Sequence, residues 1–230
     1  MKGKILKTKH IIFFIALFFF ISNAGTNADE ISNFIKKLEQ KSNNIKTLYA
    51  SIVTNGFDQD NNPVPLNISY WKSGDKIRKN LTDESETVTT LIRGDQFIVH
   101  YDKAGILLKN NVSKLTGEEL KQFRFQNFLL DYYKLNDILE KYKIKELKKN
   151  KKEYVLTLTN ERKENIDVVF EEKTLDLKKI DAELFTEGVD KLYRFKILFK
   201  EFMVNKPVDE SVFDFDLSGI RQNVDDSDFE

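Results

Sequence analysis

Apolar and polar side chains alternate along the stretch 192–204. Tyr193, Phe195, Ile197 and Phe199 take every second position, and basic residues stand between or beside them. Successive side chains of a strand point to opposite sides of a sheet, so the four lie on one face and the basic residues on the other. A strand of about 13 residues is much longer than the usual 5 to 6. The pattern predicts a large, curved antiparallel sheet with one apolar face.

Shorter runs with the same alternation occur on both sides of the centre of the chain. Turn signals such as Gly74-Asp75 and Gly94-Asp95 separate them, and this spacing is typical of successive hairpins. The predicted strands of the first half are 48–57, 66–72, 76–81, 86–93, 96–102 and 106–109. In the second half, after a basic turn at 148–152, the alternating apolar positions are Tyr154, Leu156 and Leu158, then Ile166, Val168 and Phe170, then Ile180, Ala182 and Leu184.

Two regions have helical periodicity instead. Over 29–47, apolar residues recur every three or four positions, and Asp29 or Ser32 is available as the N-cap. Further along, Thr116 and Glu119 have the spacing of a capping box, which predicts a helix start. The segment of roughly 25 residues that follows carries a wider apolar stripe than one packing face requires. We expect it to form a helical lid over the sheet.

The first 28 residues have the features of a cleaved secretory signal peptide. Four lysines lie within the first ten residues, and an apolar run follows at 11–21. That run is shorter than the roughly 20 residues of a membrane-spanning helix. Ala24 and Ala28 are both possible cleavage points. We expect an exported protein with a single domain over 29–220 and an acidic disordered tail over 221–230.

Composition and charge argue for binding over catalysis. Without the four N-terminal lysines, 33 of the 37 basic residues stand against 37 acidic ones, a net charge of −4, so nucleic acid is not an expected partner. The chain has no cysteine, and His100 is its only histidine outside the signal peptide, which leaves no Cys-His or Ser-His-Asp arrangement. Carboxylate pairs such as Glu118-Glu119 occupy solvated positions, and a hydrolase built on two acids is the weakest alternative. We expect no enzyme activity, no cofactor and no metal.

Three motifs follow one another in the mature chain. They are the hairpin 66–78 (LNISYWKSGDKIR), the stretch 91–102 (LIRGDQFIVHYD), and the ending 213–216 (FDFD) with Gly219 and Val224. In this order they resemble the LolA-like periplasmic outer-membrane lipoprotein carriers, over nearly the whole mature chain. Two positions depart from the family: Ser73-Gly74 stands where many members have Arg-Pro, whose arginine helps to hold the lid, and Leu217 replaces the proline of a Pro-x-Gly.

The resemblance implies a mainly β fold with helices (α+β), an open half-barrel sheet covered by the N-terminal helix and the central lid. It also implies a carrier that binds the acyl chains of lipoproteins and ferries them from the inner to the outer membrane. The partners would be acylated lipoproteins as cargo, an inner-membrane lipoprotein-releasing transporter as donor and an outer-membrane acceptor, and we expect a monomer. The lid would contain Phe123, Phe128 and Leu129. The acyl chains would lie against Tyr154, Leu156, Leu158, Ile166, Val168, Phe170, Tyr193, Phe195, Ile197 and Phe199.

Two other interpretations of the same apolar pattern stay open. The aromatic and aliphatic residues can form a closed core with no groove. Alternatively, the same fold can serve as a periplasmic sensor or regulatory module that binds a protein partner.

Overall fold

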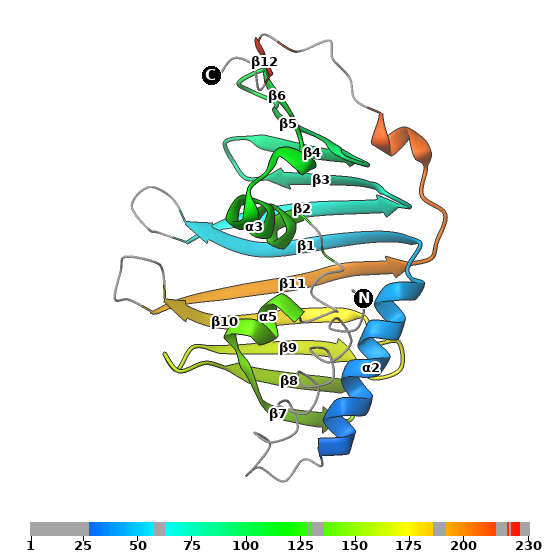
Figure 1. Cartoon of the computed structure of the whole chain (residues 1–230), viewed down its shortest axis with the longest axis vertical. Coiled ribbons are helices and arrows are strands. Elements are labelled where there is room, and N and C mark those ends of the chain that lie inside the picture. The colour runs from blue at the N-terminus through cyan, green and yellow to red at the C-terminus, as the bar shows by residue number, and fades with distance from the viewer. Residues whose placement is uncertain are drawn as a thin grey trace, which may run out of the picture.

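A single large β-sheet organises the chain, with all of the longer helices on one of its faces (Figure 1). The computed structural model describes residues 28–57, 63–127, 129, 136–185, 192–214, 220 and 222–225. The predicted signal peptide up to residue 27, Phe128 and residues 226–230 lie outside the described residues. None of the helices in the described part of the chain is long and apolar enough to cross a membrane.

The sheet has twelve strands in the order β12-β6-β5-β4-β3-β2-β1-β11-β10-β9-β8-β7. β1 to β11 pair antiparallel, mostly as hairpins between neighbours in the sequence, and the ends of the order do not pair with each other. The predicted open antiparallel sheet is confirmed, and it is consistent with a half-barrel. Its strands are β1 (Thr47–Phe57), β2 (Pro63–Ser73), β3 (Lys76–Thr82), β4 (Thr87–Arg93), β5 (Gln96–Tyr101), β6 (Ile106–Asn111), β7 (Lys143–Asn150), β8 (Glu153–Thr159), β9 (Asn165–Glu171), β10 (Leu177–Phe185), β11 (Leu192–Val204) and β12 (Gln222–Asp225).

Two of the predicted turns require glycine. Gly74 between β2 and β3 has φ 58° and Gly94 between β4 and β5 has φ 57°. This left-handed backbone conformation is strained for residues with a Cβ atom and is common in two-residue hairpin loops. The Gly-Asp pairs therefore fix the hairpin register that the sequence predicted.

A β-bulge in β11 keeps its apolar side chains on one face. Along β1, Ala50 is opposite Phe202 and Ile52 is opposite Phe199, so Lys200 is an extra residue in β11. In a regular strand of the same sequence, Phe199 and Phe202 would point to opposite sides of the sheet, because they are three positions apart and side chains alternate. The two rings instead pack edge to face with centroids 5.8 Å apart.

Helix α2 (Ala28–Asn44) covers one half of this face, across β7 to β10 (Figure 1). The Phe34 ring lies 4.9 Å from that of Tyr154 and 5.6 Å from that of Phe170, centroid to centroid. Leu38, one turn further along the same stripe, is 0% exposed. At the end of the helix Lys41 forms an ion pair with Asp176 next to β10. The predicted helix is confirmed, although it ends at Asn44 and β1 begins at Thr47.

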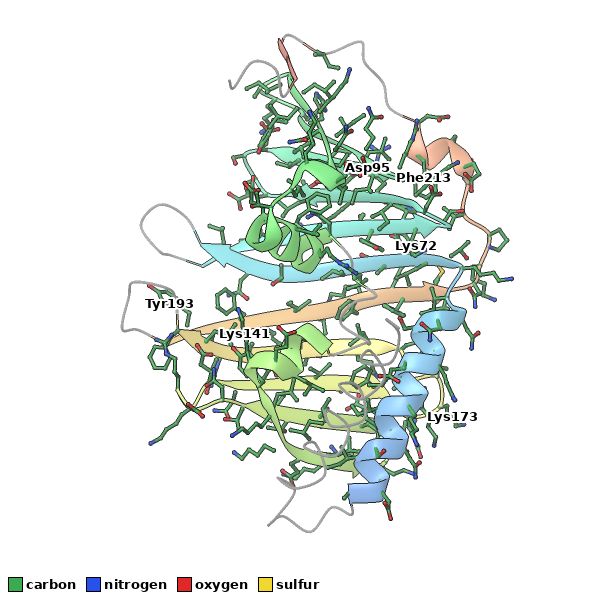
Figure 2. All side chains as sticks on the ribbon, in the orientation of Figure 1. Lys72, Asp95, Lys141, Lys173, Tyr193 and Phe213 are labelled. Carbon is green, nitrogen blue, oxygen red and sulfur yellow. The ribbon has the colours of Figure 1, made fainter. Side chains whose placement is uncertain are left out.

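The opposite face of β3 to β6 is polar only in part. Leu91 and Leu107 point to this side and are buried, but they lie outside the main core cluster. The C-terminal segment is bound here through a short 3-10 helix, η2 (Glu210–Phe213), in which Phe213 is buried (Figure 2). Two arginines of this face donate hydrogen bonds to its backbone: Arg78 to the Val212 carbonyl and Arg93 to the Phe213 carbonyl.

Two expectations from the sequence are wrong. The basic segment 148–152 was predicted to be a turn, but residues 148–150 belong to β7, where Lys149 pairs with Glu172 in an ion pair. A disordered tail was predicted from residue 221, but Gln222–Asp225 forms β12, parallel to β6. Both strands lie at an edge of the sheet. In β7 a bulge between Ile144 and Glu146 breaks the alternation of the core residues Ile144 and Leu147. β12 pairs with β6 through backbone hydrogen bonds, which need no apolar side chains.

Replacing Leu38 with alanine is expected to lower the free energy of unfolding by about 2 to 5 kcal/mol, because it leaves a cavity beneath α2. Lys37→Ala on the exposed side of the same helix is the matched control and should change stability by less than about 0.5 kcal/mol. Urea unfolding of both variants measures the difference. A similar loss for the two would show that α2 does not seal the core.

Candidate functional site

The covered face is the side of the sheet that packs against α2 and that carries Ile52, Tyr70, Leu156 and Phe199. The strand register places all ten predicted acyl-binding residues on it, since each pairs across the strands with another member or with an apolar residue of the same face. The sequence pattern therefore placed these ten residues correctly on one face of the sheet. Whether acyl chains bind there stays a prediction.

The ten residues fall into three groups in the structure. Leu156, Leu158, Val168, Phe170 and Phe199 are buried members of the main core cluster, and Tyr154, Ile166 and Ile197 are partly buried against it. Tyr193 and Phe195 are half-buried outside this cluster, and Figure 2 shows Tyr193 at the end of β11 that is remote from α2. Ile197 and Phe199 line a small cavity.

The cavity lies where β2, β1, β11 and β10 run side by side, and its volume is about 80 Å³. Cavities that hold drug-sized ligands are usually about 300–1,000 Å³. An acyl chain could therefore enter only if part of the lining moved. The described lining residues are Ile52, Thr54, Ile68, Tyr70, Lys79, Asn127, Leu129, Ile180, Ile197 and Phe199.

Two of these lining residues come from the segment predicted to be a lid. Helix α3 (Gly117–Asn127) begins where the capping box predicted, because the Glu119 carboxylate accepts hydrogen bonds from the Thr116 backbone N–H at 2.8 Å and from its hydroxyl at 2.6 Å. Asn127 at its end and the following Leu129 are 5% and 8% exposed. α3 thus ends over the cavity.

Other described residues of the central segment also pack against the covered face. Phe123 of α3 packs on Phe97 of β5 with ring centroids 4.7 Å apart. The short helix α5 (Asn136–Lys141) contributes Ile138 and Leu139 to the same core. Phe128, the third predicted lid residue, lies outside the described residues.

Lys79 was missed in the sequence analysis, and it is the charged residue among the described cavity lining. It lies in β3 opposite Tyr70 of β2 and Thr90 of β4, in a row of polar side chains across three strands of the covered face. Burial lowers the pKa of Lys79 from 10.5 to about 8. The alternation of Ile77, Lys79 and Leu81 was the available signal, since it puts the lysine on the apolar side of the strand.

A second lysine of the covered face lies outside the cavity. Lys72, at the end of β2 (Figure 2), donates a hydrogen bond to the Gly74 carbonyl of the adjacent turn. Burial lowers the pKa of Lys72, and the charge of Asp75 opposes this shift. The turn already gives the Lys72 ammonium group a hydrogen-bond acceptor and a nearby negative charge, so this lysine does not indicate a ligand site.

Ser73 and Lys76, on either side of the turn between β2 and β3, bind the C-terminal segment. The Ser73 hydroxyl donates to the Glu210 carboxylate at 2.8 Å, and Lys76 binds the same carboxylate at 2.8 Å. These contacts hold η2 beside β3. Ser73 thus contacts η2, not α3, in the described structure.

A buried carboxylate joins α5 to the sheet. Glu164, between β8 and β9, is 6% exposed and accepts hydrogen bonds from the Tyr142 hydroxyl at 2.7 Å and the Phe185 backbone N–H at 2.7 Å. Burial alone would raise the pKa of Glu164, but these hydrogen bonds and one from Asn160 outweigh it and keep the pKa below its usual value. The carboxylate is fully engaged in structure, so it is not positioned for acid catalysis.

Little else in the described residues is arranged for chemistry. His100 is on the face opposite the cavity, where it pairs with Thr89 and Leu107 across the strands. Within the described ranges, no three acidic, histidine or cysteine side chains are grouped closely enough to hold a metal ion.

No protein-family model and no curated protein matches the sequence. Among solved structures, an uncharacterized conserved protein from Thermus thermophilus is similar over 85% of this chain and 99% of that chain, with a TM-score of 0.52 and 8% identity. A LolA superfamily protein from Nitrosomonas europaea matches 79% of this chain and 98% of that chain, with a TM-score of 0.38 and 10% identity. MucB matches 83% of this chain and 64% of that chain, with a TM-score of 0.47 and 10% identity. The Thermus protein shares the fold; the two weaker likenesses carry no inference.

Replacing Lys79 with methionine is expected to stabilise the fold at neutral pH. The folded-state pKa of about 8 is lower than the usual 10.5, so the cost of burying the ammonium group is fully present below pH 8 and disappears as the pH rises to 10.5. The shift corresponds to at most about 3 kcal/mol.

Urea unfolding of the wild type and Lys79→Met at about pH 7 and about pH 10.5 measures this effect. The variant should be the more stable at the lower pH, and the difference should shrink at the higher one. Lys196→Met, exposed on the opposite face of β11, should match the wild type at both values. A difference for Lys79→Met that does not change with pH would contradict the assignment.

Glu164→Gln is expected to lower the free energy of unfolding at pH 7 by about 1 to 3 kcal/mol, because an amide cannot accept every hydrogen bond that the carboxylate accepts. The lowered pKa means that this stabilisation is present above the carboxyl's unfolded-state pKa and is lost as the pH falls through the folded-state value. Glu161→Gln, exposed in the same turn, is the control. Equal stability of the two variants at neutral pH would refute the structural role.

Proposed function

We propose that this protein is an exported periplasmic carrier that binds the acyl chains of lipoproteins on the covered face of its sheet and ferries them from the inner to the outer membrane. The observation that carries the proposal is the cavity beneath Leu129, because it lies on a largely apolar sheet face and is lined by Asn127 and Leu129 from the segment predicted to be a lid. The family resemblance of the sequence motifs supports the same function. The fold likeness to the Thermus protein supports only the architecture.

Binding would exchange one set of apolar contacts for another. Each CH₂ group of an acyl chain gains about 0.8 kcal/mol when it leaves water for an apolar site. Against this gain, the chain must displace Leu129 from the cavity that Ile197 and Phe199 also line. The cost of this displacement offsets part of the binding free energy and keeps binding reversible. A carrier requires reversible binding, since its cargo must be released to an acceptor.

The export signal and two membrane partners have the remaining roles in transport. The N-terminal signal directs export, an inner-membrane lipoprotein-releasing transporter supplies the cargo, and an outer-membrane acceptor removes it. The protein acts as a monomer and performs no chemical reaction. Tyr193, Phe195 and Ile197 of β11 form the open part of the binding surface, while the buried predicted residues, including Phe199, support it.

Filling the cavity tests the proposal. Ile197→Trp is expected to weaken binding of a triacylated lipopeptide by roughly tenfold or more, because the larger side chain occupies the space that the acyl chain would enter, and to cost about 1 to 3 kcal/mol of stability. Leu198→Trp, the next residue on the opposite face, is the matched control and should bind like the wild type. Binding is measured by displacement of a fluorescent acyl probe.

Urea unfolding of both tryptophan variants verifies that each remains folded under the binding conditions. If both variants bind the lipopeptide as the wild type does, the cavity is not the entry site. If the wild type binds no acylated ligand, the covered face is a closed core, and a sensor module with a protein partner becomes the better explanation.

A further inference from the structure

Four polar side chains on the face opposite the cavity hold η2. We call Ser73, Lys76, Arg78 and Arg93 the η2 site; they belong to β2, β3 and β4. The Ser73 hydroxyl and the Lys76 ammonium group bind the Glu210 carboxylate, each at 2.8 Å. The two arginines donate to backbone carbonyls further along the segment. The site thus presents three cationic side chains to one short acidic segment.

An aromatic ring completes the contact. Phe213 is 1% exposed, and the Lys76 ammonium group lies 5.9 Å from the centroid of its ring. The following carboxylate, that of Asp214, lies 3.6 Å from the Arg93 guanidinium group. The ligand of the site is therefore a turn that has carboxylates on both sides of a buried phenyl ring.

The same order of residues occurs a second time in the chain. Segment 209–214 is DESVFD and segment 225–230 is DDSDFE. In η2 the Asp209 carboxylate caps the turn by accepting a hydrogen bond from the Ser211 backbone N–H at 3.0 Å. Both of these residue types recur in the second segment, and Phe229 repeats the aromatic position. The second segment therefore has the acids, the cap and the ring that the η2 site binds.

One position differs in its chemistry. Asp228 stands at the place of Val212, whose side chain is half-buried. The difference favours η2 as the resident ligand, because burying a carboxylate costs free energy. Arg78, however, binds Val212 through its backbone carbonyl, and every residue has that group. The hydrogen-bonding pattern of the site therefore does not require valine.

η2 can leave the site without disturbing the core. Phe213 lies outside the main core cluster. The chain before η2 is fixed independently, because the Asn205 side-chain oxygen accepts a hydrogen bond from the Lys46 backbone N–H at 2.8 Å. The side chains of the Lys76–Glu210 ion pair are 42% and 59% exposed, and exposed ion pairs contribute little stability. Release of η2 is therefore a local event that leaves β11 in place.

The strand register directs segment 225–230 toward the η2 site. β12 is parallel to β6, so the chain leaves it in the direction of Asn111. Asn111 pairs with Gln96 and Gln96 pairs with Arg93, so the site lies at this end of the sheet. Figure 2 shows Asp95, from the turn between β4 and β5, at the same end as η2. Three strand spacings separate β12 from β4, roughly 14 Å, and five extended residues span roughly 17 Å.

We propose that the η2 site is a peptide-binding site for a capped acidic segment with an aromatic anchor, and that segment 225–230 is its second ligand. Phe229 takes the place of Phe213, and Asp226 takes the place of Glu210. A segment tethered to the site has a high effective concentration there, so the ligand comes from the same chain and not from a second copy. The two segments compete, and segment 225–230 binds when η2 leaves.

Crosslinking between introduced cysteines tests the proposal, because the chain has no cysteine of its own. In exported protein with Ser73→Cys and Asp226→Cys, a short bismaleimide should link the two positions within one chain. Ser73→Cys with Glu210→Cys is the positive control, since these side chains are in contact. Glu84→Cys with Asp226→Cys is the negative control and should react at least about tenfold more slowly, since Glu84 is exposed at the other end of β3 and β4.

Variants that weaken one segment at a time should shift the competition. Phe213→Ala removes the anchor of η2 and should raise the rate of the crosslink between positions 73 and 226 roughly tenfold or more. Asp209→Ala removes only the cap of η2 and should raise it about threefold to tenfold. It provides the same test if Phe213→Ala does not fold. Phe229→Ala should lower the rate roughly tenfold, because it removes the anchor of the competing segment.

Three results would overturn the proposal. The crosslink between positions 73 and 226 would form no faster than that of the Glu84 control, or Phe229→Ala would leave its rate unchanged. Alternatively, the product would be a crosslinked dimer, in which case the ligand is a second copy. The site lies on the face opposite the cavity, so none of these results depends on acyl binding, and the proposed function is tested separately.

Discussion

One face of the sheet carries apolar side chains. The fold depends on keeping these side chains on that face and on shielding them from water. The alternation of side chains along a strand makes this a matter of register, because a slip of one residue would turn every apolar side chain of that strand to water. Gly74 and Gly94 fix two hairpins, and the bulge at Lys200 corrects the long strand β11 at the point where simple alternation would fail. α2 then removes half of the face from water through Phe34 and Leu38.

The other half of the face is covered in a different way. A long, regular helix packs on β7 to β10, whereas the shorter helix α3 lies over β1 and β2 (Figure 1). Leu129 and Asn127 close a small cavity there, and Lys79 stands in its wall. Burying an ammonium group in apolar surroundings costs stability, and natural sequences accept such costs mainly at functional sites. The position of the lysine, more than the size of the cavity, distinguishes this region from an ordinary core.

The sequence predicted most of the fold because the dominant signals are local. Alternation identified the strands from Leu48 to Lys109 and from Tyr154 to Val204, and the capping box at Thr116 located α3. β7 was not predicted because a bulge between Ile144 and Glu146 interrupts the alternation of its apolar residues. β12 was not predicted because its pairing with β6 depends on backbone hydrogen bonds, which leave no pattern in the side chains.

The candidate site was predicted only in part, because alternation along a strand is a local signal. The ten residues proposed from β8, β9 and β11 share the covered face, but strand period alone does not say which of them α2 covers. It also does not reveal that β1, β2 and β3 supply much of the cavity wall, because strand order is a long-range property. Lys79 was missed because a single lysine in a basic strand resembles a solvated charge until the neighbouring strands show which way it points.

Native mass spectrometry with lipid extraction, on protein purified from a periplasmic fraction, tests the central claim most directly. The account predicts that part of the protein carries an acylated peptide or lipid, and that the mass of the bound species is lost after delipidation and regained when triacylated lipopeptide is added. Protein that is purified empty, and that stays empty when the lipopeptide is offered in detergent, would contradict the account and leave the covered face as a closed core.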